Sequence, residues 1–258
     1  MGNIYIIPNP NLIEKSCEIA NKYGAGFEYN DFYEPALLDD EKALEERISL
    51  YQGLGRPKGK DTLHGVFYDI CVNSADSKIA GISKDRMKQS MEIARRLNCK
   101  GVIFHTNVIP GFEPEFYLNG WLKDNANYYR ELLSEYPDIE IYVENMFDYK
   151  PDMLYRLAKE LSDEHRFGVC YDVSHSHVHD VCMEKWIELL APYIKHLHIN
   201  DNDGNTDQHK SVGSGTIDWK KYFILLSEYK IDTRMLIEVK DSDSQIESLE
   251  YLIKQELI

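Results

Sequence analysis

Nine residues of the kinds that bind metal ions are spread through the sequence, and most of them stand at or near the end of a short apolar run. They are His64, His105, Glu144, Asp172, His175, His198, Asp207, His209 and Glu238. One such histidine alone is usually a hydrogen-bonded structural residue, and one such carboxylate is usually just solvated. Four carboxylates and several imidazoles in one place would repel one another or need protons, unless a cation lies among them. If these residues converge, they predict a divalent-metal site, and their donors suit Zn, Mn, Co or Fe better than Mg.

The predicted secondary structure indicates that they do converge. Short apolar runs predict eight strands, at residues 4–7, 26–29, 62–67, 101–105, 139–144, 167–172, 194–200 and 235–239. Apolar residues at three- and four-residue spacing predict helices at 12–23, 83–97, 125–136, 152–161, 219–229 and 244–255. Eight successive βα units in 258 residues predict one (β/α)8 barrel domain over residues 1–258, whose active site lies at the carboxyl ends of the strands. A doubly wound sheet is the alternative, but the first strand–helix turn, IPNPNL, lacks the GxGxxG of a dinucleotide site.

Charge and composition indicate which kinds of molecule the protein binds. The formal net charge is −15, and the segment 31–50 is especially acidic, which predicts a solvated helix with a preceding loop. An acidic chain disfavours nucleic acid and anionic membranes as partners, although a local basic groove stays open. No apolar run is long enough to span a membrane, and five widely spaced cysteines do not indicate a disulfide framework. We therefore expect a cytoplasmic protein that acts on a small molecule, either as a monomer or as a homo-oligomer.

The motifs that surround the candidate ligands resemble the xylose isomerase-like barrel superfamily, which includes sugar and sugar-phosphate isomerases, epimerases and endonuclease IV. The segments VENM, DVSH, HLHINDNDG, DQHKSVGSGTIDW and LIEV follow the order of that superfamily at the predicted strand ends. The resemblance covers nearly the whole chain. It implies a metal-dependent enzyme, without selecting one member.

In the isomerase and epimerase branch, the resemblance implies one ion held by Glu144, Asp172, His198 and Glu238. Such an ion binds two adjacent substrate oxygens and stabilises an enediolate. The two glutamates are then the candidates for moving the proton between carbons, and His175 for contacting a substrate oxygen. A metal-dependent dehydratase begins with the same proton abstraction and is a further alternative.

In the endonuclease IV branch, the resemblance implies three zinc ions held by all nine residues, with His64, His105, His175, Asp207 and His209 completing the set. That branch acts on phosphoesters such as abasic DNA. The acidic loop EYNDFYEPALLDD after the second strand disfavours contact with a phosphate backbone. We therefore expect one ion, and up to three, in a sugar or sugar-phosphate isomerase or epimerase, with a phosphoesterase as the alternative and a non-catalytic binding barrel as the last.

Six residues are candidates for binding the substrate itself. They are His64, His105, Glu28, Phe67, Trp121 and Lys210. Ketose 3-epimerases of the superfamily carry an arginine after the histidine of strand seven, whereas residues 201–212 contain none, so Lys210 is the candidate replacement.

Overall fold

The computed structural model describes residues 3–258 and contains a closed barrel of eight parallel strands in chain order. The strands are β1 (Ile4–Ile6), β2 (Gly26–Tyr29), β3 (Thr62–His64), β4 (Gly101–His105), β5 (Glu140–Glu144), β6 (Phe167–Asp172), β7 (Ile194–Ile199) and β8 (Arg234–Ile237). Each pairs with its neighbour in sequence, and β1 pairs with β8 to close the ring. The predicted (β/α)8 barrel is therefore confirmed, although β3 and β8 end earlier than their apolar runs.

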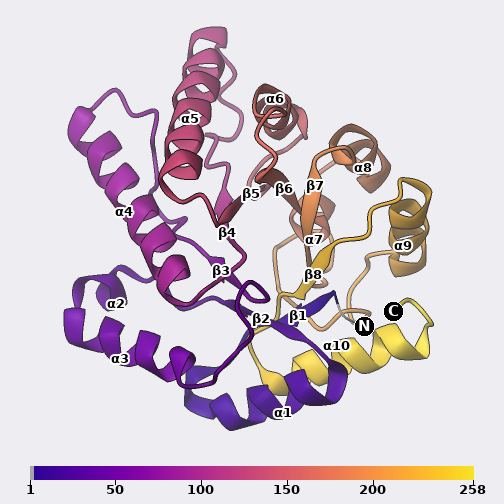
Figure 1. Cartoon of the computed structure of the whole chain (residues 1–258). Helices are drawn as coiled ribbons and strands as arrows, with labels where there is room; N and C mark the ends of the chain where they lie inside the picture. The colour runs from indigo at the N-terminus through magenta and orange to yellow at the C-terminus, as the bar shows by residue number, and fades with distance from the viewer. Residues whose placement is uncertain (1–2) are drawn as a thin grey trace.

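Helices surround the barrel, and the first and last of them, α1 and α10, lie side by side beneath β1 (Figure 1). The helices are α1 (Ile13–Tyr23), α2 (Pro35–Asp39), α3 (Glu41–Gln52), α4 (Ser77–Arg96), α5 (Glu115–Glu135), α6 (Asp152–Glu160), α7 (Val173–His177), α8 (Met183–Leu190), α9 (Trp219–Glu228) and α10 (Ser242–Lys254), with a 3-10 turn, η1, at Pro10–Leu12. The acidic segment 31–50 was predicted as one helix with a preceding loop, and it instead forms two helices, α2 and most of α3. The prediction missed α7 and α8 and began α4 and α5 too late.

Acidic residues begin several of these helices. The side chains of Asp40, Asp76, Asp218 and Asp241 each accept a hydrogen bond from a backbone amide in the first turn of α3, α4, α9 and α10. A carboxylate there satisfies an otherwise unpaired amide and interacts favourably with the helix dipole. Part of the acidity of the chain is therefore used to start helices.

The core lies mainly between the barrel and its helices, and the bottom of the barrel is filled by tyrosine rings. A Cβ on Gly101 would lie 2.5 Å from the ring of Tyr142, and one on Gly26 would lie 2.5 Å from the ring of Tyr5. Strand glycines thus make room for aromatic rings inside the barrel. Above these rings the interior is polar, which is where the candidate ligands lie.

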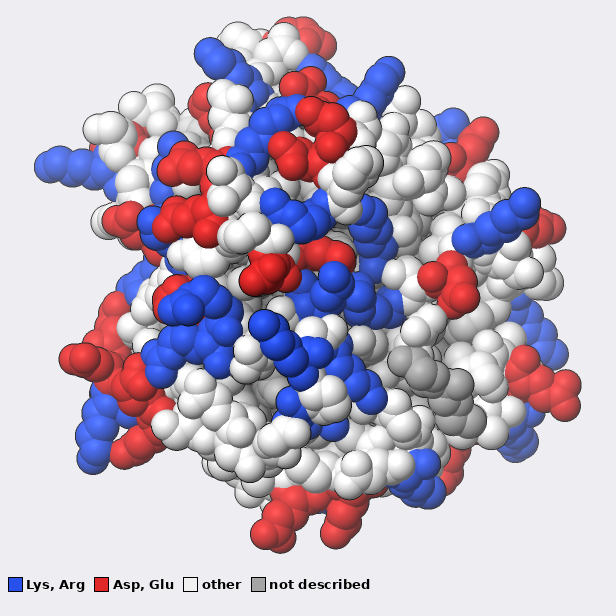
Figure 2. Space-filling model, in the orientation of Figure 1, with Lys and Arg blue, Asp and Glu red and all other residues white. Residues whose placement is uncertain are grey.

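The face of the molecule that carries both ends of the chain has an uneven charge distribution. Lys and Arg side chains gather around the middle of this face, although the chain is acidic overall (Figure 2). Lys60, Lys100, Lys195 and Arg234 stand at the beginnings of four strands. Within residues 3–258, no helix has both the length and the apolar character that crossing a membrane requires.

Candidate metal centre

The barrel brings all nine predicted ligands to the carboxyl ends of six neighbouring strands. Six of them stand at or within one residue of the ends of β3 to β8, namely His64, His105, Glu144, Asp172, His198 and Glu238. The other three are His175, on α7, and Asp207 and His209, in the loop between β7 and α9. The first six and His175 are buried, whereas Asp207 and His209 lie at the more exposed outer edge.

Glu144 is the centre of this cluster. Its carboxylate lies 3.1 Å from His198 Nδ1, 3.2 Å from His175 Nδ1 and 3.3 Å from His105 Nε2. Overlapping groups of donor atoms lie within 4.8 Å of one another, and three of them are His64–His105–Glu144, Glu144–Asp172–His175–Glu238 and His175–Asp207–His209. Glu144 therefore belongs to both of the first two groups, and His175 belongs to both of the last two.

Backbone carbonyls fix which nitrogen three of the histidines present. Nδ1 of His64, His175 and His209 lies 3.0, 2.8 and 2.9 Å from the carbonyl oxygens of Gly65, Asn145 and Glu238. Since a carbonyl oxygen only accepts, Nδ1 carries the proton in the neutral form of each ring, and Nε2 then has the lone pair. Histidines that bind metals usually have such an acceptor on the ring nitrogen that faces away from the ion.

Buried polar atoms without hydrogen-bond partners test whether a cation fits. Both carboxylate oxygens of Glu144, Oε2 of Glu238 and Nδ1 of His198 have none among the described residues. Such atoms destabilise a fold unless something compensates them. A divalent ion among carboxylate and imidazole donors provides that compensation, so the residues present fit Zn, Mn or Co.

The charges of the cluster are strongly coupled. Burial alone raises the pKa of Glu144 and of Glu238, but the neighbouring histidines outweigh it and hold both pKa values below the usual range. Burial dominates at Asp172, whose pKa is raised. Burial lowers the pKa of His175, yet Asp172, Asp207 and Glu144 outweigh it and raise that pKa well above its usual value. In the absence of an ion, protonated imidazoles therefore neutralise the carboxylates.

Two polar residues that the sequence analysis missed hold the candidate ligands in place. The side chain of Asn145 donates to the carbonyl of Asp172 (2.8 Å) and accepts from its amide (3.0 Å). These two hydrogen bonds connect the end of β5 with the end of β6. The buried carboxylate of Asp201 accepts from Trp219 Nε1 (2.7 Å) and the Gly213 amide (2.9 Å). Asp201 thus fixes the loop that carries the candidate ligands Asp207 and His209. Asn145 and Asp201 stand in VENM and HLHINDNDG, but those patterns alone do not point to these hydrogen bonds.

A cavity of about 480 Å³ opens above the cluster. Its floor includes His64, His105, Asp207, His209 and Glu238, and its walls include Tyr33, Phe67, Tyr68, Met146 and Lys240. The ring of Phe67 lies 4.7 Å from that of His105 and 4.9 Å from that of Tyr33. His64, His105 and Phe67, which were predicted to contact a substrate, line this cavity, and the contact itself stays a prediction.

Two predicted substrate contacts are corrected by their positions. Trp121 is 1% exposed and donates from Nε1 to the carbonyl of Thr106, so it packs beneath the β4 loop instead of forming a wall of the pocket. Glu28 is fully buried below the cluster, and its carboxylate faces His196, His198 and Thr62. Lys210 pairs its backbone with Asp201 and does not line the cavity, so its contact with a substrate stays a prediction.

Asp148, beside the site, makes stability depend on pH. Burial raises the pKa of its carboxyl to about 6, although hydrogen bonds from Thr106 Oγ1 (2.5 Å) and the Met146 amide (3.1 Å) oppose the shift. Because the folded pKa exceeds the unfolded one, the stability that this group contributes is present below about pH 4 and is lost as the pH rises through about 6.

Asp148→Asn is therefore expected to stabilise the protein by up to about 3 kcal/mol at pH 8 and by almost nothing at pH 4. Both donors bind the same oxygen, Oδ2, which an asparagine can replace. Urea unfolding at the two pH values measures the difference, with the exposed Asp138→Asn as the control. An equal effect of Asp148→Asn at both pH values would contradict the argument.

Comparison with known families supports the resemblance seen in the sequence. A family model described as a xylose isomerase-like TIM barrel matches residues 17–256. The uncharacterized protein MJ1614 of Methanocaldococcus jannaschii is 26% identical over 202 residues, which are 76% of this chain and 78% of that protein.

Solved structures give the same fold. The TTHB071 protein from Thermus thermophilus, soaked with ZnCl2, has a TM-score of 0.73 at 24% identity and covers 99% of this chain and 97% of its own. A D-tagatose 3-epimerase-like protein has a TM-score of 0.74 at 22% identity, and the match covers 97% of this chain and 96% of that protein. At these identities the likeness establishes the fold.

Proposed function

The chain belongs to the xylose isomerase-like TIM barrel family, and we propose that it is a divalent-metal-dependent enzyme that isomerises or epimerises a sugar or sugar phosphate through an enediolate. One observation carries this proposal. Glu238 lies at the floor of a cavity with aromatic walls, and the buried side chains of Glu144, Asp172 and His198 lie close to it. A pocket of this size suits a small polyhydroxylated molecule. The D-tagatose 3-epimerase-like neighbour is named for an activity of this class.

In this proposal Glu144, Asp172, His198 and Glu238 hold the ion, which supplies Lewis acidity toward two adjacent substrate oxygens. One of the two glutamates accepts the proton from the substrate carbon, and a carboxylate returns it to the same or the neighbouring carbon. The pKa values of both lie below the usual range, so both carboxylates are ionised at neutral pH.

The remaining groups of the pocket orient the substrate. The rings of Tyr33 and Phe67 provide apolar surfaces for the C–H face of a sugar and exclude water. Nδ1 of His175 lies 3.2 Å from Glu144 Oε1, and in this proposal the ring forms a hydrogen bond with a substrate oxygen. At the rim, Lys240 Nζ lies 3.0 Å from the hydroxyl of Tyr33 and supplies positive charge that suits a phosphate group.

A second candidate is hydrolysis of a phosphoester at a site with two or three ions. The observation that favours it is the presence of two further donor groups, His64–His105–Glu144 and His175–Asp207–His209. With backbone carbonyls fixing the protons of three of these histidines on Nδ1, their Nε2 atoms suit further ions.

Metal stoichiometry separates the two candidates. We expect about one Zn, Mn or Co per chain for the isomerase, in protein purified without chelators, with turnover of ketoses or their phosphates. Two or three ions, one of which is lost in His64→Ala, would replace it by the phosphoesterase and direct the assays to phosphoesters. A chain that binds no metal under any condition would contradict both.

A further inference from the structure

A buried carboxylate lies behind the candidate ligand His198, on the side away from the cavity. Glu28, on β2, has no exposed surface, and its Oε1 lies 3.0 Å from His198 Nε2. The other ring nitrogen, Nδ1, lies 3.1 Å from Glu144 Oε2 and 3.4 Å from Glu238 Oε2. His198 thus stands between one carboxylate below and two above.

The second oxygen of Glu28 is held by other groups. Oε2 accepts a hydrogen bond from Thr62 Oγ1 (2.8 Å) and one from His196 Nε2 (2.9 Å). The ring of His196 stacks on that of Tyr142, at 5.3 Å between centroids and 11° between planes. These contacts fix the orientation of the carboxylate, so that Oε1 stays directed at His198.

The two facing atoms are otherwise without partners. Neither Glu28 Oε1 nor His198 Nε2 has an aligned hydrogen bond among the described residues. At 3.0 Å, a small rotation of the imidazole is sufficient to align Nε2–H with Oε1.

We propose that Glu28 is a positioning residue for His198: it accepts the proton of Nε2, so that the lone pair of Nδ1 is directed at the ion held with Glu144 and Glu238. This inference depends on the proposed metal centre. It differs from the arrangement at His64, His175 and His209, where a neutral backbone carbonyl takes the same place. A carboxylate raises the basicity of the ring further, because its charge stabilises the proton on Nε2.

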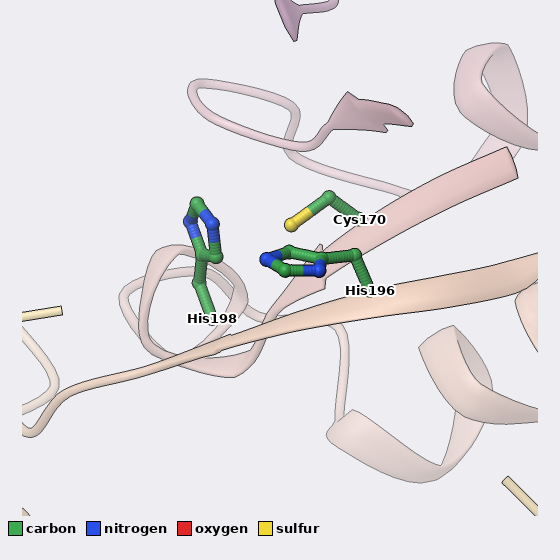
Figure 3. A group of neighbouring side chains, drawn as sticks. All are labelled: Cys170, His196 and His198. Carbon is green, nitrogen blue, oxygen red and sulfur yellow. The ribbon is translucent and has the colours of Figure 1, made fainter. Parts of the chain in front are cut away.

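Cys170 provides the contrast on the same ligand. Its sulfur points toward the rings of His196 and His198, and the three donors lie within 4.8 Å of one another (Figure 3). A thiol is only a weak hydrogen-bond acceptor, so it does not take the place of the Glu28 carboxylate as the partner of His198. Cys170 therefore packs against His198 without the function that we assign to Glu28.

The test is the affinity of metal-depleted full-length protein for Zn²⁺ and Co²⁺, measured by competition with a chelator. Glu28→Gln keeps the shape and removes the charge, and we expect it to weaken binding about 10- to 100-fold. Thr62→Val removes one hydrogen bond that orients Glu28, and we expect a smaller loss of about fivefold. The control Cys170→Ala, which also removes a buried contact of His198, is expected to keep the wild-type affinity.

The absorption spectrum of the Co²⁺ forms provides a readout that a general loss of stability does not change. A shifted spectrum in Glu28→Gln, with wild-type bands in Cys170→Ala, supports the positioning of His198. If Glu28→Gln does not fold, Thr62→Val decides on the same two measurements. Wild-type affinity and spectrum in the folded Glu28 or Thr62 variant would overturn the inference and leave the metal centre intact, whereas a wild-type chain that binds no metal would overturn both.

Discussion

Glu144→Gln is expected to lower turnover on the identified substrate by on the order of a thousandfold and to weaken metal binding. The carboxylate faces four imidazoles, those of His64, His105, His175 and His198. Its negative charge therefore interacts with all four rings. Glutamine keeps the volume but presents one neutral oxygen. The variant should therefore fold with its ligands in place and lack the charge that joins them.

Glu140→Gln is the matched control for this variant. Glu140 begins the same strand, at the opposite end of the barrel, where it pairs with Lys100 at 2.7 Å. We expect wild-type metal content and turnover there, measured by elemental analysis and by steady-state kinetics. If Glu144→Gln retained both, Glu144 would be neither a ligand nor a proton carrier, and the proposed chemistry would be wrong.

Gly215→Ala is expected to destabilise the fold by about 3 kcal/mol or more. A Cβ at this position would lie 2.2 Å from the carbonyl oxygen of Asn202 and 2.2 Å from Asp201 Oδ1. Neither atom can move easily, because Asp201 is buried and hydrogen-bonded to Trp219 and to the Gly213 amide. The clash would therefore disturb the hydrogen bonds of Asp201, which hold the loop that carries Asp207 and His209.

Gly120→Ala tests the specificity of that effect. Gly120 lies within α5, and a Cβ there would have no neighbouring atom within 4 Å, so alanine should stabilise the helix by up to about 1 kcal/mol. Urea unfolding of both variants gives the two free energies of unfolding. If Gly215→Ala were as stable as the wild type, the loop would be able to rearrange, and the claim that Asp201 fixes it would fail.

Some strand ends were predictable because the apolar run stops at a polar candidate ligand, as at His105 and Asp172. Residues 26–29, 101–105 and 167–172 were predicted as strands with the observed bounds. The start of α4 was missed because its first turn is exposed, and this helix is instead started by Asp76. In such helices a cap gives a better indication of the start than the pattern of buried residues.

The depth of a side chain along a strand was less predictable. Glu28 and Trp121 have types that suit a substrate pocket, but the register of β2 and the packing of α5 bury both. Asn145 and Asp201 support the site through hydrogen bonds whose partners lie far away in the chain or in a long loop. Residue type and spacing carry no information on such contacts, which depend on how the barrel closes.

Because the donors come from β3 through β8 and their loops, no short fragment of the chain contains a complete set. An ion bound there connects segments that only the closed barrel brings together, and it therefore binds the native state and not the unfolded chain. The free energy of unfolding should then rise with the logarithm of the free metal concentration above the dissociation constant. The lifetime of the folded protein would in that case follow the metal supply of its surroundings, even when no substrate is present.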